Sequence, residues 1–362
     1  MKITKIPNLG RFGIFIDDVD LNTITHEEWM EIGKLHMENL VTIIRGQQDL
    51  SVERQVELCT QFGDVRGGMQ YITQKKYPGI QWHDLIQWAT TGDPRIAELD
   101  RQRILNVLNV IMMYKDGQFS EAGSRVIRVS GLKDDAGRPL GMFQEGELLW
   151  HSNESGTLTF TPGVALYAKE NVVGSATGFI TTPDYYESVS NAFRSELDEM
   201  IIVHRFTPGK INPGLREEQD DLMHVNMCPV DDVEIPLVIT SPGGIRGLHH
   251  TINTAHNIKG MTLAESEAVF EKINKELFVD KYIYDHWYQN TGDYCFFDNS
   301  ITLHRRLGDV KNRMCHRIQH DYTHLQSEFW QPYDQPAIAD KFIEEMRDFV
   351  ETVGVQNFKL PA

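Results

Sequence analysis

Two of the fourteen histidines in this 362-residue chain stand near predicted strand ends, and their neighbours suit a metal site. His151 lies in the run WHSNE, and two residues later Asn153 offers a side-chain oxygen. Because residues two apart in a β-strand share a face, this spacing can present both side chains to one metal ion. A second histidine from a distant strand, His304, would add another ligand. Two histidines with one carboxylate are diagnostic of non-haem Fe(II) oxygenases.

Arginine residues follow the second histidine in the run RMCHR, at Arg313 and Arg317. A guanidinium group can hold a carboxylate through two parallel charge-assisted hydrogen bonds, which is what an anionic co-substrate beside the metal requires. Each of these pieces occurs often by chance. The ordered set is more specific: a histidine, an oxygen ligand, a downstream threonine, a distant histidine and then RxxHR.

The elements that must position these residues are mostly strands. Between residues 126 and 180, apolar runs recur at roughly ten-residue spacing with turn residues between them, as in a sandwich or barrel. Two further strands are predicted at 294–303 and 314–322. The first leads into His304. The second directly follows Arg313 and contains Arg317.

Helices are predicted around this strand-rich region, and two of them begin with a capping box, at Thr25 and at Thr262. Pro183 begins another, which is expected to run to about Ile202, and a terminal amphipathic helix is predicted over 336–353. Strands with helices to one side favour a mainly β fold, a double-sheet jelly roll with helical cover.

Residues 66–125 interrupt this pattern. Gly-Gly, Pro-Gly and Gly-Asp-Pro breaks alternate there with apolar segments. Long irregular stretches in compact domains are usually functional or mobile. We therefore interpret 66–125 as a long insertion or lid within a single domain that spans 1–362.

Composition limits the classes of partner. A net charge of −17 would repel a phosphate backbone, so nucleic-acid binding is not expected. The sequence has no apolar run of about 18 residues, so no membrane span or membrane partner is predicted. The four cysteines are scattered and form no CxxC. They predict a reduced, cytoplasmic protein without a disulfide framework.

Taken together, these motifs resemble the taurine dioxygenase/TfdA-like family of Fe(II)- and 2-oxoglutarate-dependent dioxygenases. The similar segments cover most of the chain, with residues 72–140 fitting least, and read VTIIRGQ…FGD, WHSN, PGGIRGLHHTINTAHNIKGMTLAESE, FDNSITLH and RMCHR. The resemblance implies a double-stranded β-helix (a cupin-like jelly roll) with flanking helices. It also implies an oxidoreductase that uses Fe(II), 2-oxoglutarate and O2.

The resemblance assigns roles residue by residue. His151 and His304 would bind the iron. Thr177 would contact the remote carboxylate of 2-oxoglutarate, and Arg313 would form a salt bridge to it. Arg317 would lie near the metal and the substrate. The stretch from His304 to Arg313 is slightly shorter than is usual in the family, so either arginine can be the main anchor.

This chain departs from the family at the third metal ligand, where Asn153 stands in place of a carboxylate. Three arrangements stay open. Asn153 binds weakly through its amide oxygen, or Glu154 takes its place through a local bulge, or water or an anion such as chloride fills the position. Members with a small residue here are halogenases, so halogenation is one alternative, although asparagine is bulkier. A non-catalytic binding protein on the same fold is another.

The substrate expected from the resemblance is a small polar metabolite, oxidised at a C–H bond with release of succinate and CO2. Glu147, four residues before His151, would suit a cationic group of such a substrate. His249 and His250 lie where relatives approach the substrate, and Tyr71 lies in a region of substrate contacts. Because many relatives form dimers or tetramers, a homo-oligomer is compatible with this reading.

Overall fold

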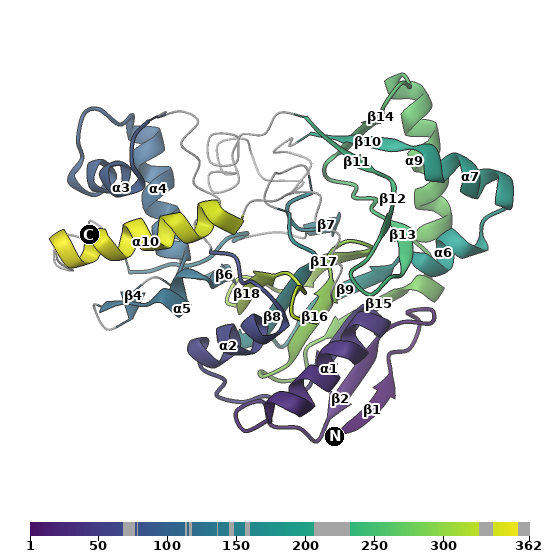
Figure 1. Ribbon diagram of the computed structural model, residues 1–362, viewed down its shortest axis with the longest axis horizontal. Coiled ribbons are helices and arrows are strands. Elements are labelled where there is room, and N and C mark those ends of the chain that lie inside the picture. The colour runs from purple at the N-terminus through teal and green to yellow at the C-terminus, as the bar shows by residue number, and fades with distance from the viewer. Residues whose placement is uncertain are drawn as a thin grey trace.

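The computed structural model describes residues 1–67, 77, 79–112, 114–115, 118–135, 137–144, 148–155, 160–205, 232–325 and 336–353. Within these residues, two sheets form the centre of the molecule (Figure 1). The larger has the strand order β1 (Lys2–Lys5), β2 (Ile14–Asp17), β3 (Val41–Ile44), β16 (Tyr294–Asp298), β8 (Gly163–Glu170), β18 (Met314–His320) and β6 (Ile127–Ser130). The smaller has the order β15 (Ile283–Trp287), β9 (Ser175–Thr181), β17 (Thr302–Gly308) and β7 (Leu148–His151).

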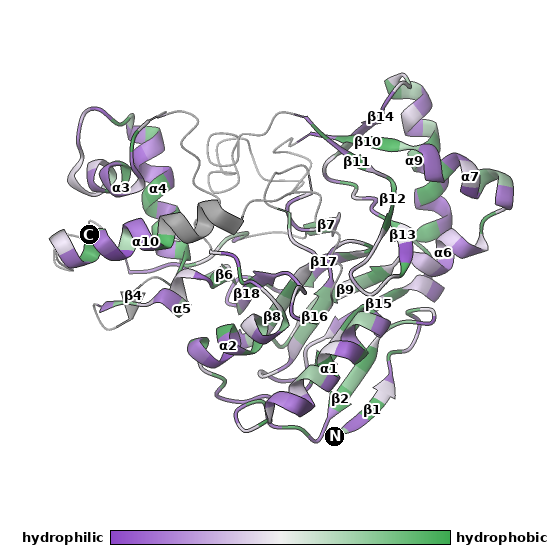
Figure 2. Cartoon of the chain, in the orientation of Figure 1, coloured by the Kyte–Doolittle hydropathy of each residue, from purple (hydrophilic) through white to green (hydrophobic). Residues whose placement is uncertain are grey.

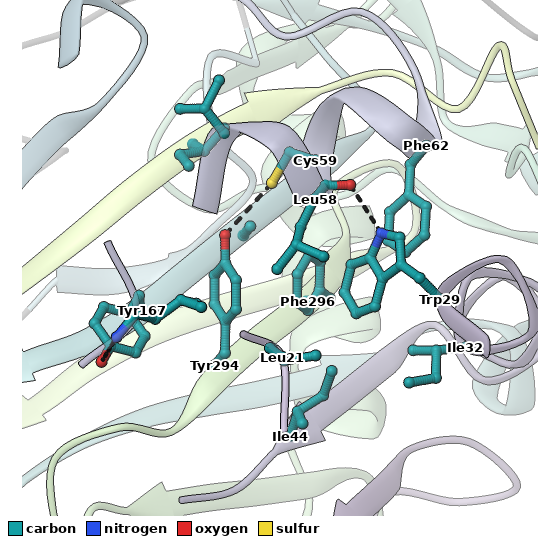
Figure 3. Close-up of a cluster of buried hydrophobic side chains, with 14 of the residues drawn as sticks. Leu21, Trp29, Ile32, Ile44, Leu58, Cys59, Phe62, Tyr167, Tyr294 and Phe296 are labelled. Atoms are coloured by element: carbon teal, nitrogen blue, oxygen red, sulfur yellow. Dashed lines mark hydrogen bonds between the residues drawn. The ribbon is translucent and has the colours of Figure 1, made fainter. Parts of the chain in front are cut away.

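The larger sheet is buried on both faces because its strands alternate between two apolar environments. On β16, Tyr294 and Phe296 pack under α1 (His26–Asn39) and α2 (Val52–Phe62), together with Trp29. Figure 3 shows this cluster, in which the Trp29 indole donates to the carbonyl of Leu58 over 2.8 Å. The intervening residues Cys295 and Phe297 belong to a second cluster, with residues from β8 and β9. That second cluster fills the space between the two sheets.

Helices cover the outer face of the smaller sheet. α6 (Pro183–Ser188), α7 (Asn191–Glu199) and α9 (Leu263–Leu277) pack against Trp150, Ile180 and Leu303 of that sheet. The capping boxes predicted at Thr25 and Thr262 are confirmed, with both reciprocal hydrogen bonds present in each. The short 3-10 helix η3 (Asp280–Tyr282) then leads into β15.

The single helix predicted from Pro183 to about Ile202 is wrong. The structure has α6, then a new helix capped by Ser190, and then the strand β10 (Ile201–His204). Tertiary pairing explains the change, because β10 lies between β11 (Val233–Pro236) and β14 (Ala255–Ile258) in a separate sheet.

Two other segments of extended chain are also divided, and one of them is predicted as a single strand. Leu237 separates β11 from β12 (Val238–Thr240), which pairs with β13 (Arg246–Leu248). The strand predicted over 294–303 is β16 followed by β17, with a turn at Asn299–Ile301 between them. This turn carries the chain from the larger sheet to the smaller one, so the predicted continuous strand serves two sheets.

A helical group lies at the opposite end of the molecule from α7 and α9 (Figure 1). It contains α3 (Trp82–Thr91), α4 (Glu98–Val110) and the terminal α10 (Pro336–Val353), which pack around one apolar cluster. The helix predicted over 336–353 is thus confirmed. The short elements β4 (Tyr114–Lys115), β5 (Gln118–Phe119) and α5 (Glu121–Ser124) lie nearby. A lid function for 66–125 stays a prediction.

Figure 2 shows hydrophobic residues on the central strands and both kinds of residue on the covering helices. This distribution is that of amphipathic helices packed on a buried sheet. Among the described residues, no helix combines the length and the apolar character needed to cross a membrane.

Candidate active site

Sheet register brings the two distant histidines together. β7 and β17 pair antiparallel, and His151 is the direct partner of His304 in that ladder. Their ring centroids lie 4.1 Å apart. Side chains directly opposite each other on one face of a sheet are close neighbours, so residues separated by more than 150 positions in sequence can face one ion.

Both imidazoles are neutral, which is the form that binds a metal. Burial lowers the pKa of His151 to about 4 and that of His304 well below its ordinary value. His151 Nδ1 lies 2.6 Å from the carbonyl oxygen of Leu149. Since a carbonyl only accepts, Nδ1 carries the hydrogen and Nε2 keeps its lone pair for a ligand. His304 Nδ1 is buried without a hydrogen-bond partner among the described residues.

Asn153 lies just beyond the end of β7, in a turn, and not on the strand that its spacing predicted. Its backbone is held by Asn299, which accepts from the Asn153 amide at 2.7 Å and donates to the Asn153 carbonyl at 2.9 Å. Asn153 is 5% exposed, and its Nδ2 has no hydrogen-bond partner in the described part of the chain. Glu154 follows in the left-handed region, with φ 62°.

One cavity of about 40 Å³ between the two sheets collects most of the predicted site residues. Its apolar wall includes Val129, Val164 and Leu166 from the larger sheet. The predicted metal and keto-acid residues that line it are His151, Asn153, Thr177, His304, Arg313 and Arg317. Glu154 does not line it, so of the two candidate oxygen ligands only Asn153 shares the cavity with both histidines.

Arg313 is fixed beside Thr177. It is 2% exposed, and its Nη2 donates to Thr177 Oγ1 over 3.2 Å. Its Nη1 donates to the Ala176 carbonyl over 3.4 Å. Arg313 directly precedes β18 and Arg317 lies on it, and both arginines line the cavity. Of the two arginines, Arg313 is therefore the one that the structure joins to Thr177.

Arg306 also lines this cavity, and the sequence analysis did not select it. It is 4% exposed, its Nη1 donates to the carbonyl of Phe143, and burial lowers the pKa of Arg306 to about 9. The available signal was its position two residues after His304 on β17, which gives both side chains the same face of the sheet.

The two predicted substrate residues that the structure describes, His249 and His250, do not line this cavity. His249 is buried between Ser155 Oγ, 3.0 Å from its Nε2, and the Ser300 carbonyl, 2.7 Å from its Nδ1. His250 Nε2 lies 2.7 Å from Asn274 Oδ1, with its ring beside Phe270. Neither histidine lines the cavity. Glu147 and Tyr71 lie outside the described residues.

The donor set fits a ferrous ion with a keto acid. The described residues contain no cluster of three His, Cys, Asp or Glu side chains that could hold a metal. Two neutral imidazoles do converge, however, and the amide of Asn153 shares their cavity. Imidazole suits iron, and a neutral oxygen donor leaves the centre dependent on anionic ligands from the co-substrate. Arg313 and Thr177 offer donors for a carboxylate in the same space.

Comparison with known proteins identifies the family of the chain. Residues 106–319 match the model of the family described as "Taurine catabolism dioxygenase TauD, TfdA family". A curated relative is the alpha-ketoglutarate-dependent 2,4-dichlorophenoxyacetate dioxygenase of Cupriavidus pinatubonensis (strain JMP 134 / LMG 1197). It is 23% identical over 320 residues, which cover 86% of this chain and 95% of the relative.

Solved structures show the same fold. A taurine dioxygenase from Burkholderia xenovorans has a TM-score of 0.58 at 20% identity, with 88% of each chain covered. AAD-2 in complex with Mn(II) and N-oxalylglycine has the same TM-score at 17% identity, covering 88% of this chain and 96% of that chain. The predicted jelly roll with flanking helices is thereby confirmed.

Proposed function

Because the chain belongs to the TauD/TfdA family of 2-oxoglutarate-dependent dioxygenases, we propose that it hydroxylates, or otherwise oxidises, a C–H bond of a small polar metabolite. Its enzyme class is that of its family, an oxidoreductase that uses Fe(II), 2-oxoglutarate and O2. The observation that carries the proposal is the shared cavity of His151, His304 and the Arg313–Thr177 pair.

Different side chains of the site would bind the metal and the keto acid. His151 and His304 would hold the iron, with Asn153 as a neutral third donor. Arg313 and Thr177 would receive the remote carboxylate of 2-oxoglutarate. When bound, iron and 2-oxoglutarate supply the oxidation of the substrate by O2, with release of succinate and CO2.

The walls of the cavity support the same chemistry. Apolar side chains from both sheets line it, and the Phe297 ring lies 4.6 Å from that of His304. Such walls exclude bulk water, which strengthens the ionic contacts of a bound keto acid. Positioning of the co-substrate and protection of the reacting centre are thus tasks of the protein itself.

The metal centre is tested by anaerobic titration of the protein with Fe(II) and 2-oxoglutarate, following the metal-to-ligand charge-transfer band. We expect the band in the native chain and its loss in His151→Ala and His304→Ala. His316→Asn is a matched control, because His316 lies on the helix-facing side of β18, with its Nδ1 3.2 Å from Gln55 Oε1. A band that persists in both alanine variants would contradict the proposed centre.

Halogenation is a second candidate, favoured by the absence of a carboxylate ligand beside His151 and His304 in the described residues. Because asparagine is neutral, a halide at the metal would supply the negative charge that a carboxylate ligand otherwise supplies. Mass spectrometry of the product formed in chloride buffer separates the two reactions. A chlorinated product identifies a halogenase, and an added oxygen atom identifies a hydroxylase.

A further inference from the structure

A buried tyrosine lies behind the residues that would hold the keto acid. Tyr288, which directly follows β15, is 1% exposed. Its hydroxyl oxygen is 2.8 Å from Thr177 Oγ1. On its other side the hydroxyl is 3.9 Å from Cys295 Sγ, and the guanidinium carbon of Arg313 lies 5.2 Å from the centroid of its ring. Tyr288 therefore touches both members of the carboxylate-binding pair without lining the cavity.

The hydroxyl of Thr177 has one hydrogen that can be donated and two lone pairs that can accept hydrogen bonds. Arg313 Nη2 donates to this oxygen, which occupies one lone pair. When Tyr288 donates as well, both lone pairs are occupied, and the threonine hydrogen must point elsewhere. Since Thr177 lines the cavity, that hydrogen is then directed to a ligand in the cavity.

A bound carboxylate favours Tyr288 as the donor, because an anion in the cavity accepts the Thr177 hydrogen and the tyrosine hydrogen is then left for the second lone pair of Thr177. Burial raises the pKa of Tyr288 well above its ordinary value, so the phenol keeps its hydrogen. Burial also raises the pKa of the Cys295 thiol, whose S–H can donate weakly to the tyrosine oxygen. Hydrogen bonds aligned in this way polarise one another in a low-dielectric interior. The resulting order of donors is Cys295, Tyr288, Thr177 and then the ligand.

The guanidinium group is held in a matching orientation. Arg313 Nε donates to Cys315 Sγ over 3.0 Å. Nη1 donates one hydrogen to the Ala176 carbonyl, and Nη2 donates one hydrogen to Thr177 Oγ1. Each terminal nitrogen of a guanidinium group carries two hydrogens. One N–H therefore stays on each for the forked contact that a carboxylate accepts.

We propose that Tyr288 is a positioning residue, which turns the Thr177 hydroxyl toward the cavity so that Thr177 and Arg313 together bind the remote carboxylate of the keto acid. This inference rests on the proposed function and deepens it. Tyr288 acts through Thr177 and is not itself a catalytic residue. Its hydroxyl is expected to matter only for ligands that carry the remote carboxylate.

The test compares two keto acids of equal chain length. Calorimetry on anaerobic, Mn(II)-loaded protein measures the Kd of 2-oxoglutarate and of 2-oxopentanoate, which lacks the remote carboxylate. We expect Tyr288→Phe to weaken 2-oxoglutarate binding about tenfold, as for loss of one hydrogen bond to an ionic contact, and to leave 2-oxopentanoate unchanged. Tyr294→Phe is the control, because this equally buried hydroxyl contacts Cys59 Sγ on the helix-covered face of the larger sheet and does not line the cavity (Figure 3).

A double-mutant cycle with Thr177→Val supplies a second measurement. We expect Thr177→Val to cost less affinity for 2-oxoglutarate in the Tyr288→Phe background than in the native one, because coupled residues are not additive. Equal weakening of both keto acids, or additive losses in the cycle, would overturn the role of Tyr288. If the native protein binds neither keto acid, the proposed function fails instead.

Discussion

At the scale of single residues, the proposed neutral third donor, Asn153, is the most consequential feature of this site. Asn153 stands where a carboxylate would balance part of the metal charge, and its backbone is held from both sides by Asn299. The main-chain geometry is therefore independent of the side chain at 153. Changing the side chain should alter the electrostatics of the site while the turn persists.

We predict that Asn153→Asp strengthens metal binding and has little effect on the metal-free protein. Because Arg306 and Arg317 line the same cavity, a carboxylate at 153 has guanidinium groups nearby, so the thermal unfolding temperature of the metal-free variant should change little. A carboxylate is a stronger ligand than an amide, so the Fe(II) affinity should rise by at least about tenfold. Differential scanning calorimetry with and without Fe(II) measures both. A variant whose metal affinity does not rise would argue against residue 153 as a ligand.

The proposed metal ligands were the easiest part of the site to select from the sequence, since few side-chain types bind iron. The pattern at His151, His304 and Arg313 could be recognised in the sequence because few residue types bind iron or carboxylates. Arg306 was not selected, and His249 was proposed although it packs away from the cavity. An arginine or histidine can contact a ligand or pack in the core. The direction of its side chain decides between the two, and the residue type does not reveal that direction.

At the scale of elements, the turn between β16 and β17 connects the core to the site. Asp298 Oδ1 accepts from the amides of Ser300 (2.8 Å) and Ile301 (3.0 Å), and burial raises the pKa of Asp298 from 3.8 to about 7. A carboxyl group with a raised folded pKa binds more protons in the folded state than in the unfolded state. The protein should therefore lose stability as pH rises from about 4 to about 7.

Asp298→Asn removes this titration and keeps an oxygen acceptor for both amides. We predict that the free energy of unfolding of the variant, relative to the native protein, increases between pH 5 and pH 8. The increase should be on the order of a few kcal/mol, since one pKa unit corresponds to about 1.4 kcal/mol. Urea unfolding across this range checks it, with Asp18→Asn as an exposed-site comparison. A difference that does not vary with pH would show that Asp298 is ionised in the fold.

At the scale of the whole molecule, α3, α4 and α10 form a helical group whose core also includes Ile127 of β6. Met346 of α10 is fully buried in this group. We predict that Met346→Ala lowers the free energy of unfolding by about 2–5 kcal/mol, as for other large-to-alanine core changes. Because the cluster is continuous with the sheet, unfolding should stay a single transition. Two separated transitions in calorimetry would mean that the helical group folds independently.

By itself, the sequence determined the strand-rich composition and the capped helices and indicated the proposed ligand types, because these follow from residue chemistry and from periodicity within short windows. Only the tertiary structure decided that residues 294–303 serve two sheets, that β10 is a strand, and that Tyr288 lies behind Thr177. Strand pairing and the direction of a side chain depend on partners far along the chain. Those partners are chosen by burial of the whole core, which no local pattern records.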